Sequence, residues 1–210
     1  MAVALQLLDE QGAEALTMRR LAEALSSGTA TLYRHFASRE DLVAQVVDQV
    51  FAEMREGTSC ALPGGGAQEW QKACRGLAHH MFLVLGRHPG AARLLVDVPP
   101  MGPNAMKQRE HSLAILLANG FEPRMAAKTY ATLARYVLGF AMQLSSTLGE
   151  DQHLFVGLDA ARLPATHALA SVLPVSLEEE FLFGLELMLE GLGVLRAGPD
   201  PDAPHDPSPR

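Results

Sequence analysis

The sequence predicts an all-α protein, built from a small three-helix head at the N-terminus and a larger helical body. Three observations predict this fold class. Apolar residues recur at helical spacing along most of the chain, residues that cap helices precede these segments, and Gly or Pro separates them. By these signals the chain should hold about nine to ten helices. Its 210 residues, 48% of them apolar, can bury a sizeable core in one or two domains.

A short helix is predicted directly after Thr17. Thr is a good N-cap, and apolar residues follow at helical spacing, so one face of this helix is apolar. Three residues that favour a turn come next, because Ser hydroxyls compete for backbone hydrogen bonds and Gly28 tolerates a positive φ. The apolar residues are Met18, Leu21, Ala22 and Leu25, and the turn is Ser26, Ser27 and Gly28.

A second short helix is expected from Thr29 to Phe36. Leu32 and Phe36 lie four residues apart on its core side, which leaves Tyr33 and Arg34 on the opposite side. A helix, a turn and a second helix in this order form a helix-turn-helix pattern, and such a pattern can present side chains to a DNA groove.

The remaining helices follow from caps and breaks. Ser38 begins a longer helix, with Asp41 as the Asp variant of a capping box, and Glu179 has the same relation to Ser176 in the last helix. Residues 57–66, with one Pro and four Gly, are expected to form a flexible hinge, and residues 157–175 a long connection. The predicted helices are Ser38–Arg55, Gln68–Leu85, a short helix after Pro89, Asn104–Ala118, Pro123–Leu148 and Ser176–Arg196.

The predicted domains are a head of residues 1–50, a body of residues 51–197 and a proline-rich tail of residues 198–210 that we expect to be disordered.

Two parts of the chain resemble the TetR family of bacterial transcription regulators. The strings LLDEQGAEALTMRRLAEAL and TLYRHFASREDL, within residues 3–50, resemble the family's DNA-binding domain. FLFGLELMLEGL resembles the last helix of the tetracycline-repressor subtype, and EWQ and NGF fall at suitable positions between these segments. The resemblance covers nearly the whole folded chain. It implies a DNA-binding head and a body that binds an effector and forms a dimer.

By the resemblance, residues of the head contact phosphates, the groove and the DNA backbone. Arg34 is the best candidate for reading bases, because Arg bound to guanine is the commonest specific contact. For Tyr33 a ring packed on the head's own surface is the alternative, and for Arg19 a solvated surface charge is equally open. The predicted DNA-binding residues are Thr17, Arg19, Thr29, Thr31, Tyr33, Arg34, His35 and Arg39.

The head also departs from the family pattern. The family usually has Gly, an aliphatic residue and Ser where this chain has Ser26, Ser27 and Gly28. The chain starts inside the first helix, so we expect the basic N-terminal arm of many relatives to be missing. Residues 1–50 hold four Arg against seven Asp and Glu. Either these departures make DNA binding weak and steeply dependent on salt, or the sequence as given begins late.

The resemblance also places an effector pocket in the body. A lining of Leu, Val and Met with isolated Arg and Ser suits a largely apolar ligand that bears one acidic or hydrogen-bonding group. A tetracycline–magnesium complex is not expected, because, by the resemblance, apolar residues stand at the positions whose side chains hold that complex in the tetracycline repressor. The alternative is that these apolar residues simply fill the core. The predicted effector-binding residues are Arg55, Leu77, Met81, Leu95, Val98, Arg109, Ser112 and Gln143.

The last helix predicts assembly into a homodimer. Apolar residues surround most of its circumference, and a helix that covers a single core cannot bury all of them. Gly184 and Gly191, with Gly139 and Ala134 on the preceding long helix, would let a neighbouring backbone come close. A homodimer supplies the two-fold symmetry that reads a palindromic double-stranded operator with half-sites roughly 34 Å apart or farther. The alternative is a monomer with a very large core.

The remaining sequence features narrow the choice of function. No signal peptide or long apolar span is present, and Cys60 and Cys74 have no metal-ligand spacing, so we expect a cytoplasmic protein with reduced thiols and neither metal nor cofactor. No catalytic motif is found. The sequence therefore predicts a ligand-responsive transcriptional regulator, most simply a repressor. The alternative is a helical dimer that binds a small molecule or a protein without specific DNA binding, which the acidic head and the altered turn favour, and the net charge of −7 argues against indiscriminate nucleic-acid binding.

Overall fold

The computed structural model describes residues 1–56, 68–144 and 158–197, which form ten α-helices, one 3₁₀ helix and no β-strand. The predicted all-α class is confirmed. The elements are α1 (Ala2–Gln11), η1 (Ala13–Ala15), α2 (Met18–Ala24), α3 (Thr29–Leu32), α4 (Arg39–Arg55), α5 (Glu69–Arg87), α6 (Pro89–Asp97), α7 (Pro103–Ala118), α8 (Pro123–Ala141), α9 (Pro164–Ala168) and α10 (Leu177–Ala197).

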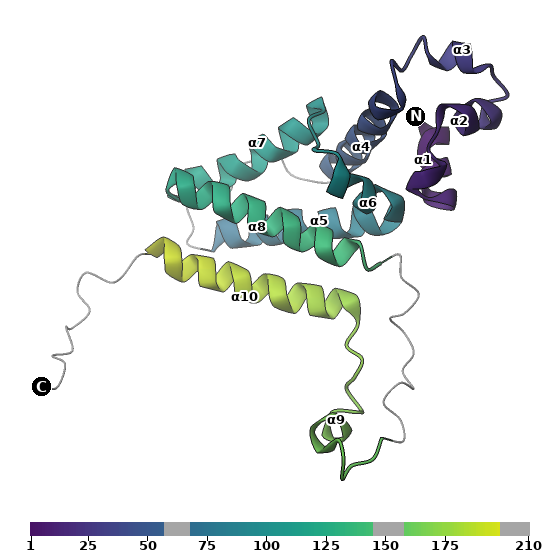
Figure 1. Ribbon diagram of the computed structural model, residues 1–210. Coiled ribbons are helices and arrows are strands. Elements are labelled where there is room, and N and C mark those ends of the chain that lie inside the picture. Colours follow the sequence, from purple (N-terminus) through teal and green to yellow (C-terminus); the bar gives the residue numbers. More distant parts are fainter. Residues whose placement is uncertain (57–67, 145–157, 198–210) are drawn as a thin grey trace, which may run out of the picture.

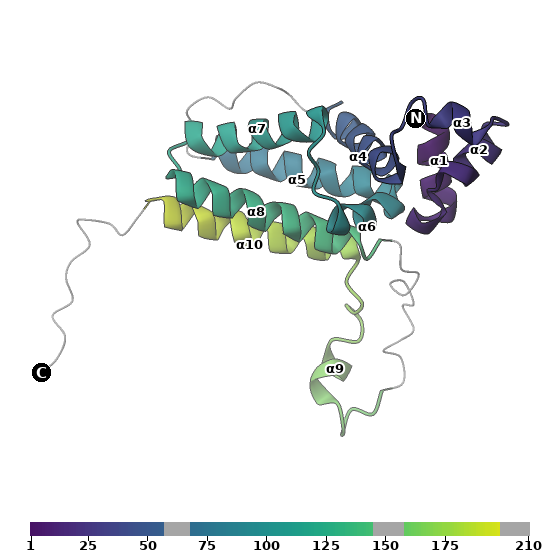
Figure 2. The same cartoon turned by 45° about the horizontal axis from the view of Figure 1, so that its top comes forward.

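The helices form a small head and a larger body. In Figure 1, α1, α2 and α3 lie together at one end, and α4 connects them to the body. Within the body, α5 packs against α7, α8 and α10. Figure 2 shows α10 along one side of the body and α7 on the opposite side, with α9 on a projection away from both. The described part of the chain contains no helix that is both long and apolar enough to cross a membrane.

Helix α4 begins where its sequence predicts. The Ser38 hydroxyl accepts a hydrogen bond from the backbone N–H of Asp41 at 3.2 Å. The Asp41 carboxylate reaches back one residue beyond the N-cap and accepts from the backbone N–H of Ala37 at 2.8 Å. Leu42, Val46 and Val50 are fully buried on one face, so α4 contributes to the core of both head and body.

The turn between α2 and α3 differs from the prediction in where its positive φ lies. The backbone N–H of Ser27 donates to the carbonyl of Ala22 and that of Ser26 to the carbonyl of Glu23, which is the hydrogen-bond pattern of a Schellman motif. The residue that takes the left-handed conformation is Ser26, with φ +49°, whereas Gly28 has φ −79°. A position that favours Gly is therefore occupied by Ser.

Helix α3 is shorter than the predicted range of Thr29–Phe36. Its α-helical part ends at Leu32. The N–H groups of Arg34 and His35 then donate to carbonyls three residues back, at 3.2 and 2.8 Å, because the chain tightens into turns before the cap of α4. This four-residue helix has no side-chain cap, since its N-cap is Gly28.

Two further predicted boundaries change in the body. Helix α8 ends at Ala141 instead of Leu148, because the N–H groups of Gln143 and Leu144 donate to carbonyls three residues back. The expected connection of residues 157–175 contains a short helix, α9, which Pro164 starts. The hinge of residues 57–66, which includes Cys60, and the tail of residues 198–210 lie outside the described residues.

Helix α10 begins at the predicted cap residue, Ser176, and divides its apolar residues between two faces. The Ser176 hydroxyl accepts from the N–H of Glu179 at 3.3 Å and donates to the Glu179 carboxylate at 2.9 Å. Phe181, Leu185 and Leu189 are fully buried against α5 and α8. A second set remains exposed, namely Phe183, Leu187, Val194 and Leu195.

Gly184 does not serve the role expected of it. A Cβ at this position would overlap the Tyr136 hydroxyl of α8 in the same chain, so Gly184 allows close packing inside one protomer. Tyr136 donates from its hydroxyl to the carbonyl of Phe181 at 2.8 Å, and burial and then the nearby Glu180 carboxylate raise the pKa of Tyr136. Ala134 lines a cavity in the body. Gly139 and Gly191 have open space beside them.

Candidate DNA-binding and effector-binding sites

Helix α3 and the turn after it present an exposed polar face. Thr29, Thr31, Arg34 and His35 are all exposed, whereas Leu32 and Phe36 are buried behind them. The Tyr33 ring is 58% exposed, which contradicts the alternative that it packs on the head's own surface. Figure 1 shows α3 at the end of the head away from the body. This face is therefore accessible to a DNA duplex.

The four Arg of the head differ in what they contact. Arg34 makes no hydrogen bond or ion pair with another residue that the structure describes. Arg19 pairs with Glu23 of the same helix at 3.1 Å, and Arg20 donates to the Gln11 side chain. Arg39 donates to the carbonyls of Leu16 at 2.9 Å and Ala13 at 3.4 Å. Only Arg34 among these four has a guanidinium with all its donors available.

Two predicted DNA-contact residues, Thr17 and Arg39, form hydrogen bonds with backbone groups of the head itself. The Thr17 hydroxyl accepts from the backbone N–H of Arg20 at 3.3 Å and so caps α2. Arg39 fixes the start of α4 to the chain before α2, as its two backbone contacts show. Both side chains remain near the exposed face, but each can reach DNA only with the atoms that these contacts leave available.

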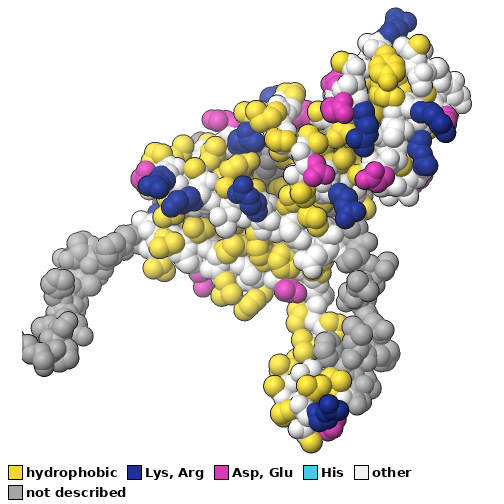
Figure 3. Space-filling view, viewed as in Figure 1, with side chains coloured by type: hydrophobic (Ala, Val, Ile, Leu, Met, Phe, Trp, Pro, Cys, Tyr) yellow, Lys and Arg dark blue, Asp and Glu magenta, His cyan; other side chains and the backbone are white. Residues whose placement is uncertain are grey.

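Acidic residues at the start of α4 keep the head's charge mixed. Hydrogen bonds from its own backbone N–H and then from the Ser38 hydroxyl hold the pKa of Glu40 below its usual value. The Gln45 side chain and then the Ala37 backbone lower the pKa of Asp41 in the same way. Both carboxyl groups are therefore charged near neutral pH. Figure 3 shows Lys or Arg and Asp or Glu side chains interspersed on this part of the surface.

A cavity of about 550 Å³ lies in the body between α4, α5, α6, α7 and α8. Its lining is mostly apolar. Five of the predicted effector-binding residues line it, and they come from three different helices. These residues are Leu77, Met81, Leu95, Arg109 and Ser112.

Three predicted residues do not line this cavity. The Arg55 guanidinium lies 3.5 Å from the Asn104 side-chain oxygen at the contact of α4 with α7. Val98 ends α6 and packs against the core, and Gln143 follows the end of α8, where its side chain donates to the Gly139 carbonyl at 3.3 Å. These three residues, which the resemblance assigns to the pocket, lie at or just after the ends of α4, α6 and α8.

Other lining residues were missed by sequence reasoning. Helical spacing could have found Cys74 and Ala78, since they share a face of α5 with Leu77 and Met81. No local signal indicates that Phe51 of α4 or Arg135 of α8 should reach the same cavity. The set missed is Phe51, Cys74, Ala78, Val96, Pro100, Gln108, Tyr130, Ala131, Leu133, Ala134, Arg135, Val137 and Leu138.

The cavity has cationic groups without a carboxylate among its lining residues. Arg109 donates to neutral partners, namely the Tyr130 hydroxyl at 3.3 Å, the Pro100 carbonyl at 3.4 Å and the sulfur atoms of Met106 at 3.2 Å and Met101 at 3.8 Å. Arg135 lines the same cavity. Burial raises the pKa of Cys74 to about 12, so this lining thiol is neutral. The arrangement can balance the charge of an anionic group on an otherwise apolar ligand.

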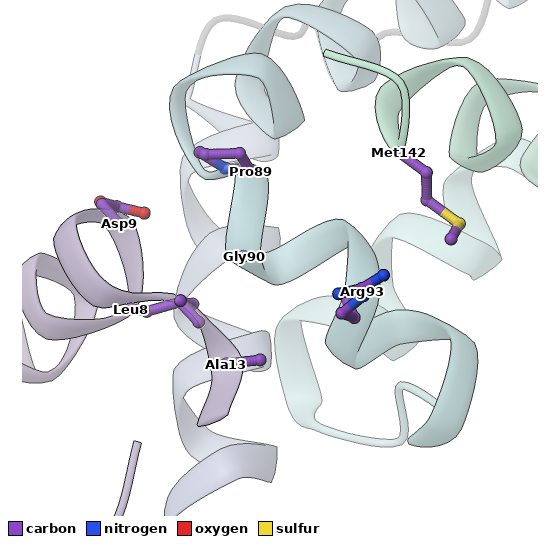
Figure 4. A pocket seen from close by; sticks show the side chains of 8 residues that line it. Leu8, Asp9, Ala13, Pro89, Gly90, Arg93 and Met142 are labelled. Atoms are coloured by element: carbon purple, nitrogen blue, oxygen red, sulfur yellow. The ribbon is translucent and has the colours of Figure 1, made fainter. Parts of the chain in front are cut away.

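The head meets the body at His88, the N-cap residue of α6. One ring nitrogen of His88 lies 2.9 Å from the Asp9 carboxylate of α1, and the other lies 2.9 Å from the Glu53 carboxylate of α4. A cavity of about 290 Å³ lies beside this contact, and in Figure 4 Leu8 and Ala13 of the head line it opposite Gly90 and Arg93 of α6. A Cβ at Gly90 would overlap Leu8, so head and body pack closely here.

The described residues include no group of three or more His, Cys, Asp or Glu side chains that could hold a metal ion. His79, which adjoins His80 on α5, is 2.8 Å from the Glu178 carboxylate of α10.

Comparison with protein families identifies two matching regions. Residues 1–46 match the family described as bacterial regulatory proteins of the tetR family. Residues 62–196 match the tetracyclin repressor-like C-terminal domain. Together they cover the head and nearly all of the body.

Related sequences are transcription regulators. The HTH-type transcriptional repressor DrrR1 of Streptomyces coeruleorubidus is 30% identical, with 92% of this chain and 76% of that protein covered. The class E tetracycline repressor protein of Escherichia coli is 29% identical over 91% of this chain and 88% of that protein. An HTH-type transcriptional regulator of Saccharopolyspora erythraea is 33% identical, and the match spans 65% of this chain but only 55% of that protein.

Solved structures give the same result. Apo ActR from Streptomyces coelicolor has a TM-score of 0.80 and 29% identity, with 93% of each chain covered. ActR in complex with actinorhodin has a TM-score of 0.76 and 30% identity, covering 91% of this chain and 92% of that chain. The exposed face of α3, the cavity in the body and these matches together show that the chain belongs to the TetR family of ligand-responsive, DNA-binding transcriptional regulators.

Proposed function

We propose that this protein is a cytoplasmic repressor that binds a palindromic operator as a homodimer and leaves it when a small effector enters the body. The observation that carries the proposal is the path of α4. This helix follows the turn after α3, is capped by Ser38 in the head, and contributes Phe51 to the cavity lining in the body. A ligand that changes the cavity can therefore act on the helix that holds the head.

In this proposal the exposed residues of α3 and its following turn enter the major groove. Arg34 reads bases, because its guanidinium is free of other described residues. Tyr33, His35 and Thr29 contact phosphates, and Thr31 faces the groove. Arg19 and Arg39 support binding less directly, since each already has a protein partner.

The proposed effector is a largely apolar molecule that carries one anionic group. Leu77, Met81 and Leu95 supply apolar contacts, and the anionic group binds Arg109, with Arg135 adding a second positive charge. ActR, a structural relative, has been solved with actinorhodin and with (S)-DNPA, which makes these two compounds the first to test on this chain.

The proposed homodimer forms through the exposed apolar face of α10. Phe183 and Val194 are 69% and 73% exposed in the protomer, and burying such side chains is favourable. The dimer places two heads on one operator, which compensates for the few free cations of each head.

The test is a mobility-shift titration with DNA from the region beside the protein's own gene, at low and at moderate salt. We expect a specific complex whose affinity falls steeply as salt rises. If no specific complex forms at micromolar dimer, the repressor proposal fails, and the alternative of a helical dimer without specific DNA binding is supported.

Effector binding is tested by thermal shift with actinorhodin, (S)-DNPA, minocycline and the aromatic acid anilinonaphthalene sulfonate. We expect Tm to rise with an apolar acid for the wild type and for Arg124→Gln, which changes an exposed residue outside the cavity lining. Arg109→Gln should lose most of this rise, because it removes a cation of the lining. Equal rises in Tm for Arg109→Gln and the wild type would contradict the proposed anion contact.

A further inference from the structure

Helix α7 begins without a side-chain cap of its own. Its N-cap is Gly102, which has no side chain, and Pro103 follows it. The first N–H groups of a helix need acceptors, and a side-chain oxygen usually supplies one at the second or third helical residue. Gly102 cannot supply a side-chain oxygen that would accept from these N–H groups.

The missing cap comes from α4. One carboxylate oxygen of Asp48 accepts from the backbone N–H of Asn104 at 2.9 Å and from that of Ala105 at 3.0 Å. The other oxygen accepts from the Asn104 side-chain amide at 2.9 Å. A negative charge at this end of a helix is also favoured by the helix dipole. Asp48 thus occupies the place of an N-cap residue although it lies on another helix.

The contact leaves no room for adjustment. A Cβ at Gly102 would overlap the Asp48 side chain, so this side chain packs directly against the backbone at the start of α7. Asp48 lies five and six residues, about one and a half turns, after Val43 and Leu42, which are buried in the head's side of α4. Any shift of α4 along or around its axis must therefore either move the first turn of α7 or break the three hydrogen bonds.

The segment before Gly102 is also tied to the effector cavity. Arg109, which lines the cavity, donates to the carbonyl of Pro100 and lies 3.2 Å from the Met106 sulfur, both near the start of α7. These two contacts share the Arg109 guanidinium with any anion that enters the cavity. The chain from Pro100 to Ala105 is thus bonded both to Arg109 of the cavity lining and to Asp48 of α4.

We propose that Asp48 is the positioning residue that couples the cavity to the DNA-binding head. An anion bound at Arg109 draws the guanidinium from Pro100, the start of α7 shifts, and Asp48 carries this shift to α4. The inference rests on the proposed function. By reciprocity, operator DNA bound to the head must act on the start of α7 through the same residue, which allows a test without a known effector.

The test compares the wild type with Asp48→Asn and Glu122→Gln. Asp48→Asn keeps the size of the side chain but removes the charge. Glu122 is the matched control, because its carboxylate caps α8 from within that helix's own N-terminus, at 3.2 Å from the N–H of Met125, and joins no other element. Asn104→Ala is a second variant, which removes only the side-chain amide bond to Asp48.

The first measurement is operator affinity by fluorescence anisotropy. We expect all four proteins to bind within about threefold of one another, because none of the three substitutions lies on the exposed face of α3. Loss of specific binding by the wild type itself would refute the proposed function rather than the role of Asp48.

The second measurement is hydrogen exchange of the peptide that covers residues 100–112, with and without operator DNA. In the wild type and Glu122→Gln, DNA should slow exchange at Asn104 and Ala105 at least threefold. Asp48→Asn, whose amide oxygen can still accept from the two backbone N–H groups but without the negative charge, should show a smaller change than the wild type, and so should Asn104→Ala. The role of Asp48 is overturned if DNA slows exchange equally in Asp48→Asn and the wild type, or if it leaves the wild type unchanged.

Discussion

At the scale of single residues, the head relies on very few available cations. Arg39 and Arg19 carry positive charge but already contact Leu16 and Glu23, whereas Arg34 has no partner among the described residues. Specific hydrogen bonds to bases require free donors with fixed geometry, so the four Arg of the head are not equivalent. The sequence shows where these cations lie along the chain, but it does not show which are already paired.

Replacement of Arg34 by Ala should weaken operator binding by about 1–3 kcal/mol and flatten the preference at one base pair. Anisotropy titrations with the operator and its single-base variants measure both effects. Arg19→Ala is the control, and it should weaken all these DNA sequences equally and only slightly, because Arg19 is shared with Glu23. Base discrimination that persists unchanged in Arg34→Ala would rule out its role in reading bases.

Cys74 should be chemically inert in the folded protein. Burial raises its pKa from 9.0 to about 12, so the thiolate that reacts with alkylating reagents is a small minority at pH 8. In a Cys60→Ser background, iodoacetamide should label Cys74 only after denaturant is added, as mass spectrometry would show. Rapid labelling of the native protein would mean that the cavity is more open than this structure indicates.

The same raised pKa gives a dependence of stability on pH. Above pH 9 the unfolded chain loses the Cys74 proton while the folded chain retains it, so folding binds a proton. The contribution of Cys74 is therefore fully present below pH 9 and is lost as the pH rises towards 12.

At the scale of elements, the turn of the helix-turn-helix stores backbone strain. Ser26 takes the left-handed conformation that ends α2, at a cost of roughly 1–2 kcal/mol for a residue with a Cβ. Glycine avoids this cost but loses roughly 0.5–1 kcal/mol through its freedom in the unfolded chain.

Ser26→Gly should therefore raise the free energy of unfolding by about 0.5–1 kcal/mol in urea titrations. Ser27→Gly is the matched control, because Ser27 does not have a positive φ, and it should destabilise the protein by a similar amount. The strain argument is wrong if both variants lose stability.

Elements with local signals could be predicted from the sequence, and those that depend on distant contacts could not. Ser38 and Ser176 cap the helices that they were expected to cap, because a cap acts within three residues of itself. The cap of α7 could not be predicted from the sequence, since Asp48 lies 56 residues before its partner Asn104. The resemblance led to five residues of the cavity lining, Leu77 among them, while Phe51 and Arg135 reach the cavity only through the tertiary packing of α4 and α8.

At the scale of the whole molecule, α10 leaves the chain with an exposed apolar face. One stripe of this helix is buried against its own chain, and the other leaves Phe183 and Leu187 largely exposed. Figure 3 also shows apolar side chains along this side of the body and on the α9 projection. The sequence predicted that α10 would be buried twice. The sequence assigned Gly184 to close packing against a second protomer, whereas Gly184 packs against Tyr136 of its own chain. The two cases could not be told apart because small residues occur on both faces of α10.

Replacement of Leu187 by Glu should therefore convert the proposed dimer into a monomer. The introduced carboxylate would be desolvated inside an apolar interface. This desolvation costs more free energy than the burial of one Leu contributes to dimer formation. Sedimentation equilibrium measures the change in mass. Operator affinity should fall about 100-fold or more, because two linked heads bind one palindrome far more tightly than separate heads do.

The control for this experiment is Leu117→Glu. Leu117 is also exposed, but it lies on α7, on the opposite side of the body from α10 in Figure 2. This variant should remain dimeric and bind the operator as the wild type does. If Leu187→Glu stays dimeric, the interface lies elsewhere. If it becomes monomeric and still binds the operator with full affinity, the two heads do not depend on α10 to act together, and the few cations of a single head are sufficient.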